Sequence, residues 1–294
     1  MTSSKIILTS LLCFTLSGIG RSYSQTDSLP VAIADSAAKS AAVKKHSLFV
    51  STAFGSNMIF LGSSISSNNP YYGAGLVYGY KGSFFLSASA THIRDIEPFG
   101  AFFSAAADYK HTFNKWFDVA AEVAGYKTDF RRREKLFSDF TYAGFTAGFD
   151  WKILYTRITS SLIYSGETKG YLQISNSRYF QTPYFLKKKA YVSFFPEINL
   201  LMGQLVKVDD DSGNPIQGYM PPFFRQRPDQ PLPLITVSTR FAPVYLNFSS
   251  PVTFSYKGFS LEADPCYILP TFKDNMIKPP KGFTFYMTAT FRIF

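Results

Sequence analysis

The chain has 294 residues, of which 18% are aromatic and only 17% charged. Soluble globular domains carry about 25% charged residues, so this composition argues against an ordinary soluble domain. Its 31 Phe and 19 Tyr favour strands and membrane interfaces. The formal net charge of +10 suits nucleic acid or anionic lipid, and the export signal described next argues against nucleic acid.

The first residues read as an export signal. Lys5 supplies a positive start, residues 6–16 form a short apolar run, and Ser22 and Ser24 place small residues before Gln25. These features predict a signal peptide over residues 1–24. Residues 25–45 are rich in Ala, Ser and Lys and read as a periplasmic linker. The mature chain then keeps one cysteine, Cys266, which excludes an intramolecular disulfide and favours a packing role.

From His46 to Phe294 the dominant pattern is an alternation of apolar and polar residues, which is the period of a β-strand. Residues 283–293 alternate Phe, Phe, Met, Ala, Phe and Ile with polar residues, and the odd positions of 259–263 are apolar as well. Val244, Leu246 and Phe248 are likewise expected on one apolar face. The runs reach about 10 residues, the length of a transmembrane strand and longer than the soluble average of ~5–6.

This alternation predicts an all-β fold, a transmembrane antiparallel up-and-down β-barrel over residues 46–294. Short and long connections alternate along the chain, which is typical of outer-membrane barrels. Twelve strands are expected; ten and fourteen are the nearest alternatives because residues 165–202 are ambiguous, and a soluble barrel is the alternative class. The expected strands are 46–60, 70–80, 83–94, 99–111, 115–127, 137–149, 153–164, 170–180, 189–202, 233–256, 259–269 and 282–294.

The predicted location is the outer membrane of a Gram-negative bacterium. Phe294 ends an amphipathic strand, and a terminal aromatic resembles the signal that the barrel-assembly machinery recognises. Phe294 shares the parity of the polar row, however, so the strand end either bulges or turns this side chain inward. The expected partners are this machinery, outer-membrane lipid and lipopolysaccharide.

Several short phrases carry a resemblance to a known group of proteins. They are residues 46–51 (HSLFVS), residues 55–62 (GSNMIFLG), residues 176–183 (NSRYFQTP) and residues 281–285 (KGFTF). Together with a signal that ends in Ser-Gln, they resemble an uncharacterised family of Bacteroidota outer-membrane barrels. The resemblance covers residues 46–294 and implies a location and a fold but no activity.

Charged residues of the polar row are expected to face the lumen, because a charge on the lipid face costs ~2–4 kcal/mol at the bilayer midplane. One interpretation is a passive or gated channel, or a binding barrel, for a small polar solute. The alternative is a closed lumen with a structural or partner-binding role. The lumen-facing candidates are Asp108, Lys110, Asp118, Glu122, Arg157, Glu197, Glu262, Asp264 and Arg292.

An outer-membrane hydrolase is the third interpretation, and we expect no enzyme. A catalytic triad needs a base placed between an acid and a nucleophile. The three histidines, His46, His92 and His111, fall at different levels of the predicted barrel. The least unfavourable combination is His92 with Asp95 and a nearby serine. Residues 209–214 (DDDSGN) match a calcium loop poorly, so no metal site is expected. No cofactor is expected either.

Two predicted outer loops carry further candidates. Arg131, Arg132 and Arg133 are candidates for contact with lipid headgroups at the outer leaflet. The loop at 203–232 holds five prolines together with aromatic and arginine residues. Long loops are often functional or disordered, so this loop is either a lid, a partner surface or a mobile tip.

Overall fold

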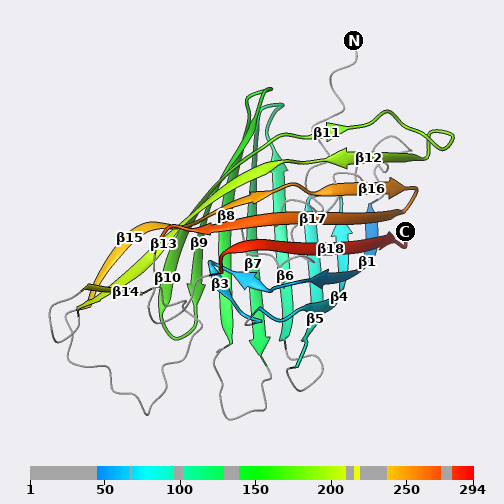
Figure 1. The fold of residues 1–294 in the computed structure, drawn as a ribbon. Coiled ribbons are helices and arrows are strands. Elements are labelled where there is room, and N and C mark those ends of the chain that lie inside the picture. Colours follow the sequence, from blue (N-terminus) through cyan, green and yellow to red (C-terminus); the bar gives the residue numbers. More distant parts are fainter. Residues whose placement is uncertain are drawn as a thin grey trace.

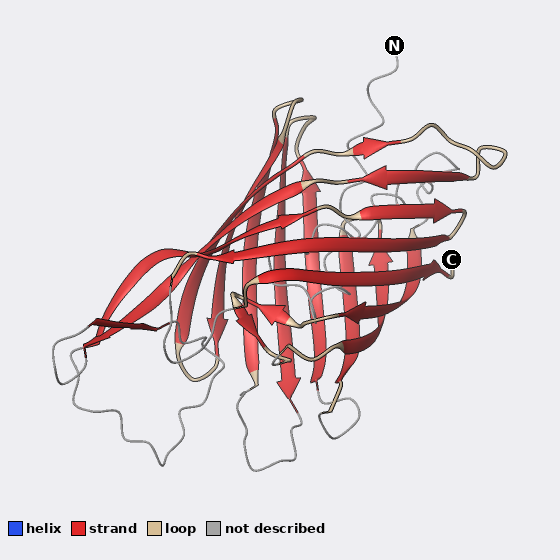
Figure 2. Cartoon of the chain, viewed as in Figure 1, coloured by secondary structure: helices blue, strands red, loops and turns tan. Residues whose placement is uncertain are grey.

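The computed structural model describes residues 45–66, 68–95, 102–128, 139–209, 215–218, 237–272 and 280–294. In these ranges every regular element is a strand, as the strand colouring of Figure 2 shows. No helix in the described part of the chain has the length and apolar character needed to cross a membrane. The predicted signal peptide, 1–24, lies outside the described residues, and so does the predicted linker except for Lys45.

The strands form one antiparallel sheet that closes on itself (Figure 1). The closing contact joins β18 to β1 on one side and to β17 on the other. The predicted twelve-stranded antiparallel barrel is therefore confirmed. Its wall consists of β1 (His46–Gly55), β4 (Tyr71–Tyr80), β5 (Phe84–Ile93), β6 (Phe102–Thr112), β7 (Phe117–Thr128), β8 (Phe140–Asp150), β9 (Tyr155–Tyr164), β10 (Thr168–Ser177), β13 (Glu197–Asp209), β15 (Val237–Ser249), β17 (Phe259–Pro270) and β18 (Gly282–Arg292).

Six short strands lie outside the wall's own twelve, and four of them pair with the wall or extend it. β11 (Phe180–Gln181), β12 (Ala190–Phe194) and β16 (Val252–Tyr256) continue the lines of β10, β13 and β15 after short breaks, and they pair with one another and with β17. β14 (Pro215–Gly218) pairs with the far end of β13. The ambiguous region 165–202 thus forms two wall strands with extensions, which excludes ten and fourteen strands.

The two ends of the barrel differ in the length of their connections. At one end, β4–β5, β6–β7, β8–β9 and β16–β17 are joined by two to four residues, and β11–β12 by residues 182–189. The ends of β1 and β18 lie there too. The other connections are longer, except for the turn at 165–167. Short turns mark the periplasmic end of such barrels, so we call the two ends the inner and outer ends.

The outward and inward rows of the wall have opposite character. Large apolar side chains of the outward row are exposed, as for Leu76, Leu86, Val123, Phe283 and Phe291. The inward row is buried and rich in polar side chains. Alternation in the sequence thus becomes a lipid-facing outer surface and a polar interior, as the row at 283–293 predicts.

Three parts of the predicted strand pattern are wrong. The strand expected to end at residue 202 continues to Asp209, so residues 203–209 belong to β13 and not to the loop expected over 203–232. The strand expected over 46–60 ends at Gly55; the chain then turns inward and forms a small hairpin of β2 (Ile59–Phe60) and β3 (Ser63–Ser64). In β15, a register shift pairs Leu201 with Tyr245 but Met202 with Pro243. The extra residue is a β-bulge, which changes the parity. Val244, expected on the outward row, is therefore buried inside.

Inward glycines make room for aromatic rings inside the barrel. A Cβ placed on Gly55 would lie 2.1 Å from the ring of Tyr71, and one on Gly148 would lie 2.1 Å from the hydroxyl of Tyr155. Gly55 and Tyr71 are direct cross-strand partners of β1 and β4. The ring of Tyr71 therefore occupies the space that a side chain at position 55 would fill.

We expect the variant Gly55→Ala to destabilise the barrel by about 1–3 kcal/mol, because the added methyl group overpacks against Tyr71. The measurement is urea unfolding of the protein refolded in lipid vesicles. Gly125→Ala is the matched control, because a Cβ there meets no atom within 4 Å. Equal stability of the two variants would show that this ring packing contributes nothing.

Candidate functional site

The barrel interior is divided along its axis into an apolar outer part and a polar inner part. The inward side chains near the outer ends of the strands join one buried apolar cluster. The wall members of this apolar seal include Ile93, Phe102, Tyr126, Phe140, Ile163, Tyr171, Leu205, Ala242, Ile268 and Tyr286.

The β2–β3 hairpin occupies the centre of the apolar seal. Met58, Ile59, Phe60, Leu61 and Ile65 are all at most 2% exposed. They belong to the same cluster as the wall residues around them.

The hairpin contacts opposite sides of the wall. The ring of Phe60 lies 5.8 Å from that of Tyr126 and 5.2 Å from that of Phe140, on β7 and β8. At the hairpin tip, a Cβ on Gly62 would lie 2.7 Å from Val244 of β15. Because β15 and β7–β8 are far apart in the strand order, the hairpin bridges the lumen.

Polar groups at the base of the hairpin hydrogen-bond one another, which allows its backbone to be buried. The side-chain oxygen of Asn57 accepts hydrogen bonds from the hydroxyls of Ser64 (2.6 Å) and Ser66 (3.0 Å). The Ser66 hydroxyl in turn accepts one from the amide of Met58 (2.9 Å). Ser56 anchors the segment to β18, donating its amide to the carbonyl of Phe285 (2.9 Å).

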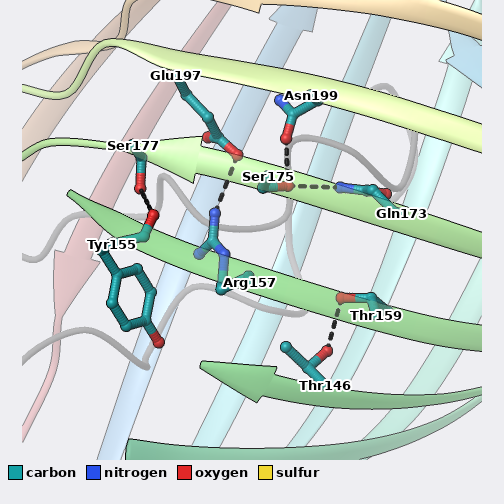
Figure 3. Close-up of polar contacts among 9 residues, drawn as sticks. All are labelled: Thr146, Tyr155, Arg157, Thr159, Gln173, Ser175, Ser177, Glu197 and Asn199. Carbon is teal, nitrogen blue, oxygen red and sulfur yellow. Dashed lines mark hydrogen bonds and ion pairs between the residues drawn. The ribbon is translucent and has the colours of Figure 1, made fainter. Parts of the chain in front are cut away.

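Below this seal, the inward side chains are polar and hydrogen-bonded across strands (Figure 3). Arg157 of β9 reaches over β10 and donates from Nη2 to Oε1 of Glu197 on β13, at 3.0 Å. On β10, Ser175 donates to Oδ1 of Asn199 and accepts from the amide of Gln173. Both charged partners, Arg157 and Glu197, are buried.

A second group of charges lines β6 and β7. Lys110 Nζ lies 3.9 Å from Oδ1 of Asp118, and the hydroxyl of Tyr155 donates to Oδ2 of the same carboxylate at 2.8 Å. One step toward the outer end, Asp108 and Glu122 are direct cross-strand partners. Each is 7% exposed, and both line a small pocket together with Tyr142.

Like charges directly opposite each other are destabilising, so the pairing of Asp108 with Glu122 places two acidic side chains where they would repel each other if both were ionised. Neither carboxylate oxygen of Asp108 has a hydrogen-bond partner within the described residues.

The remaining lumen candidates lie on β17 and β18. Glu262 accepts a hydrogen bond from Thr253 (3.2 Å), and Asp264 accepts one from the thiol of Cys266 (3.3 Å). Both carboxylates are buried, and Cys266 is a buried free cysteine. Arg292 is half-buried at the inner end of β18. Among the described residues, the fully buried charges are thus five carboxylates and two cations, Lys110 and Arg157.

The other candidates are less well placed or not described. Arg131, Arg132 and Arg133 lie outside the described residues, and so do residues 210–214 of the segment that matches a calcium loop poorly. Of the loop at 203–232, the structure describes only residues 203–209, as part of β13, and 215–218, as β14. In the described ranges no three His, Cys, Asp or Glu side chains gather as a metal site would require.

The histidines stand apart from one another. His46 Nδ1 lies 2.5 Å from the hydroxyl of Tyr78, and His111 packs edge-on against Phe113. His92 lies near the outer end of β5, and Asp95, its nearest acid in sequence, is exposed and lies 3.8 Å from Arg94. His46 and His111 thus lie at the inner end of the barrel, and His92 lies near the outer end.

A closed antiparallel barrel with an apolar outward row, a polar inward row and short turns at one end is an outer-membrane β-barrel. This class follows from the strand pairing and from the two faces of the wall.

Comparisons with known proteins give the following. No protein-family model and no curated protein matches the chain. Similar solved structures include the KdgM porin, at 7% identity over 83% of this chain and 98% of that chain, with a TM-score of 0.46. LpxR from Salmonella typhimurium is 9% identical over 84% and 99%, with a TM-score of 0.43. An outer membrane channel from Pseudomonas putida F1 is 8% identical over 86% and 97%, with a TM-score of 0.41.

We expect Arg157→Leu to destabilise the barrel by about 3–5 kcal/mol, because it leaves the Glu197 carboxylate buried without its cation. The double variant Arg157→Leu/Glu197→Leu should recover most of this loss, since apolar side chains often replace a buried ion pair without cost. Urea unfolding in vesicles measures both. A double variant as unstable as the single one would contradict the pairing, and Arg94→Leu, at an exposed pair, is the control.

Proposed function

We propose that the chain is a gated outer-membrane channel for small polar solutes, closed by the β2–β3 hairpin. The observation that carries the proposal is the position of this hairpin, whose apolar side chains join the apolar seal across the outer part of the lumen. A barrel core that only has to be filled would be at least as stable with apolar side chains, because burying charged groups costs desolvation free energy. The polar, charged inner part therefore favours a solute path over a solid core. A seal above a polar interior is what a closed channel needs.

The closed-lumen barrel with a structural or partner-binding role is the second candidate. The seal favours it as well, since the hairpin is buried and hydrogen-bonded at its base. The two candidates differ in whether the hairpin leaves the lumen. The proposal for this chain includes four further points. We propose that it belongs to a Bacteroidota-specific barrel family and has no catalytic role. We also propose that the barrel-assembly machinery inserts it and that it contacts lipopolysaccharide.

The excess of buried carboxylates also supports a solute class. Five carboxylates face two cations in the described interior, and rings of acidic side chains select cations in channels. Asp108 and Glu122 sit at the boundary between the seal and the polar part. We therefore propose that the channel prefers small cationic solutes over anionic ones.

Disrupting the seal should open the channel. We expect Ile59→Asp/Phe60→Asp to raise single-channel conductance in planar bilayers well above that of the parent protein, which should be nearly silent at low voltage. Two charges cannot be buried in the apolar seal without a large cost, so the hairpin should leave the lumen.

The matched control is Ile59→Leu/Phe60→Leu, which keeps the apolar bulk and should stay closed. A second variant replaces residues 57–69 by a short Gly-Ser turn, because Gly55 and Tyr71 are already paired. Heat-modifiable migration in gels verifies that each barrel is folded. Silence of both opened variants would overturn the gate and favour the closed-lumen candidate.

Selectivity has a separate measurement. In an opened variant, a KCl gradient should give a reversal potential with the sign that cation preference requires. Adding Asp108→Asn/Glu122→Gln to that variant should move the reversal potential toward zero. Glu167→Gln, at an exposed outer turn, is the control and should leave the potential unchanged. An unchanged potential in the lumen variant would remove these two side chains from the solute path.

A further inference from the structure

Every turn at the inner end of the barrel carries lysine. The β4–β5, β6–β7, β8–β9, β11–β12 and β16–β17 turns together contain seven lysines and no Asp or Glu. All seven side chains are exposed. These inner-turn lysines are Lys81, Lys115, Lys152, Lys187, Lys188, Lys189 and Lys257.

Most of these lysines occupy a backbone conformation that does not suit them. Lys81, Lys152 and Lys257 have φ values of 51°, 70° and 52°, and Lys187 and Lys188 have 57° and 62°. These five are the majority of the nine non-glycine residues with positive φ in the described chain. Glycine and asparagine adopt this conformation at lower cost. Turn formation therefore does not explain lysine at these positions, whereas a need for its charge does.

Exposed aromatic side chains surround the same end. Trp116 and Trp151 lie in the turns and are 55% and 62% exposed, and Phe113 is exposed beside them. Such aromatics mark the level of the lipid headgroups.

The lysine ammonium groups reach the same level. Lys45 and Lys81 lie 5.6 Å and 5.3 Å from the ring centroid of Tyr80, and Lys257 lies 5.2 Å from that of Tyr256. We call these inner-end aromatic side chains the aromatic belt, and Lys81 and Lys257 adjoin it directly.

We propose that the inner-turn lysines form a binding surface for anionic phospholipid headgroups of the periplasmic leaflet. The recognised group is the lipid phosphate, which an ammonium group binds as a point charge. Seven lysines without an acidic side chain in the same turns attract such lipids from a mixed bilayer. A lipid fits better than a soluble partner because the lysines adjoin the aromatic belt. This surface is separate from the lumen, so it does not depend on the gate.

The two tryptophans make the surface directly measurable. The chain contains two Trp, and both lie in inner turns, so its Trp fluorescence reports on lipids at this rim. The protein is refolded into phosphatidylcholine vesicles that hold a minor fraction of brominated phosphatidylglycerol or, separately, of brominated phosphatidylcholine. We expect phosphatidylglycerol to be enriched about fivefold beside the tryptophans, the effect of roughly one lysine near an anionic surface. The enrichment should vanish in 1 M salt.

The decisive variant replaces the five positive-φ lysines by asparagine: Lys81→Asn, Lys152→Asn, Lys187→Asn, Lys188→Asn and Lys257→Asn. Asparagine tolerates this conformation, so the variant should keep or gain stability in urea unfolding while losing the phosphatidylglycerol enrichment. The same five positions changed to arginine should retain it. The control Lys127→Asn/Lys281→Asn removes two exposed lysines of the outer end and should bind like the parent protein.

Two results would overturn the proposal. One is equal quenching by the two brominated lipids in the parent protein, which would leave a soluble anionic partner as the better explanation of the charge. The other is full enrichment in the five-asparagine variant, which would show that the lipids gather without these lysines. A loss of folding in the asparagine variant would also count against it, because lysine would then have a structural role in the turns.

Discussion

Closure of the sheet is the constraint on which the rest of the structure depends. Inside a bilayer no water satisfies the backbone, so each N–H and C=O of the wall needs a partner in a neighbouring strand. The pairing of β18 with both β1 and β17 removes the last free edges. Once the wall is closed, alternate side chains have only two destinations, lipid or lumen, and the sequence must alternate accordingly.

Closure also creates the problem that the interior solves. A barrel of this size encloses a volume that side chains of the wall must fill or leave to solvent. Here the two parts of the axis use different solutions. Near the outer end, inward aromatics and the inserted β2–β3 hairpin form an apolar seal. Nearer the periplasm, polar side chains hydrogen-bond across strands, with the Arg157–Glu197 pair among them.

The sequence was sufficient for the wall and insufficient for its contents. Alternation is a local property, so the strands and their two faces could be predicted. The hairpin has a weaker local signal: the four apolar residues 58–61 break the alternation, but only the structure shows where they go. The pairing of Asp108 with Glu122 depends on register. The expected strands 99–111 and 115–127 centre the turn on residue 113, which would place Asp108 opposite Asp118. The observed turn comprises residues 113–116, so the partner of Asp108 is Glu122, four residues further on. Nothing in the local sequence pattern around Val244 predicts the β-bulge there.

The energetics of the seal bear on how a channel of this design would work. Fully burying a large apolar side chain is worth about 1.5–3 kcal/mol, and the hairpin buries five of them. Five at the lower value give ~7.5 kcal/mol, which corresponds to an open population below about one in 10⁵. Thermal fluctuation alone would therefore leave the lumen closed. In the gated channel proposed above, opening would require a ligand or partner that binds the displaced hairpin or the emptied lumen, and its differential affinity would have to match this difference.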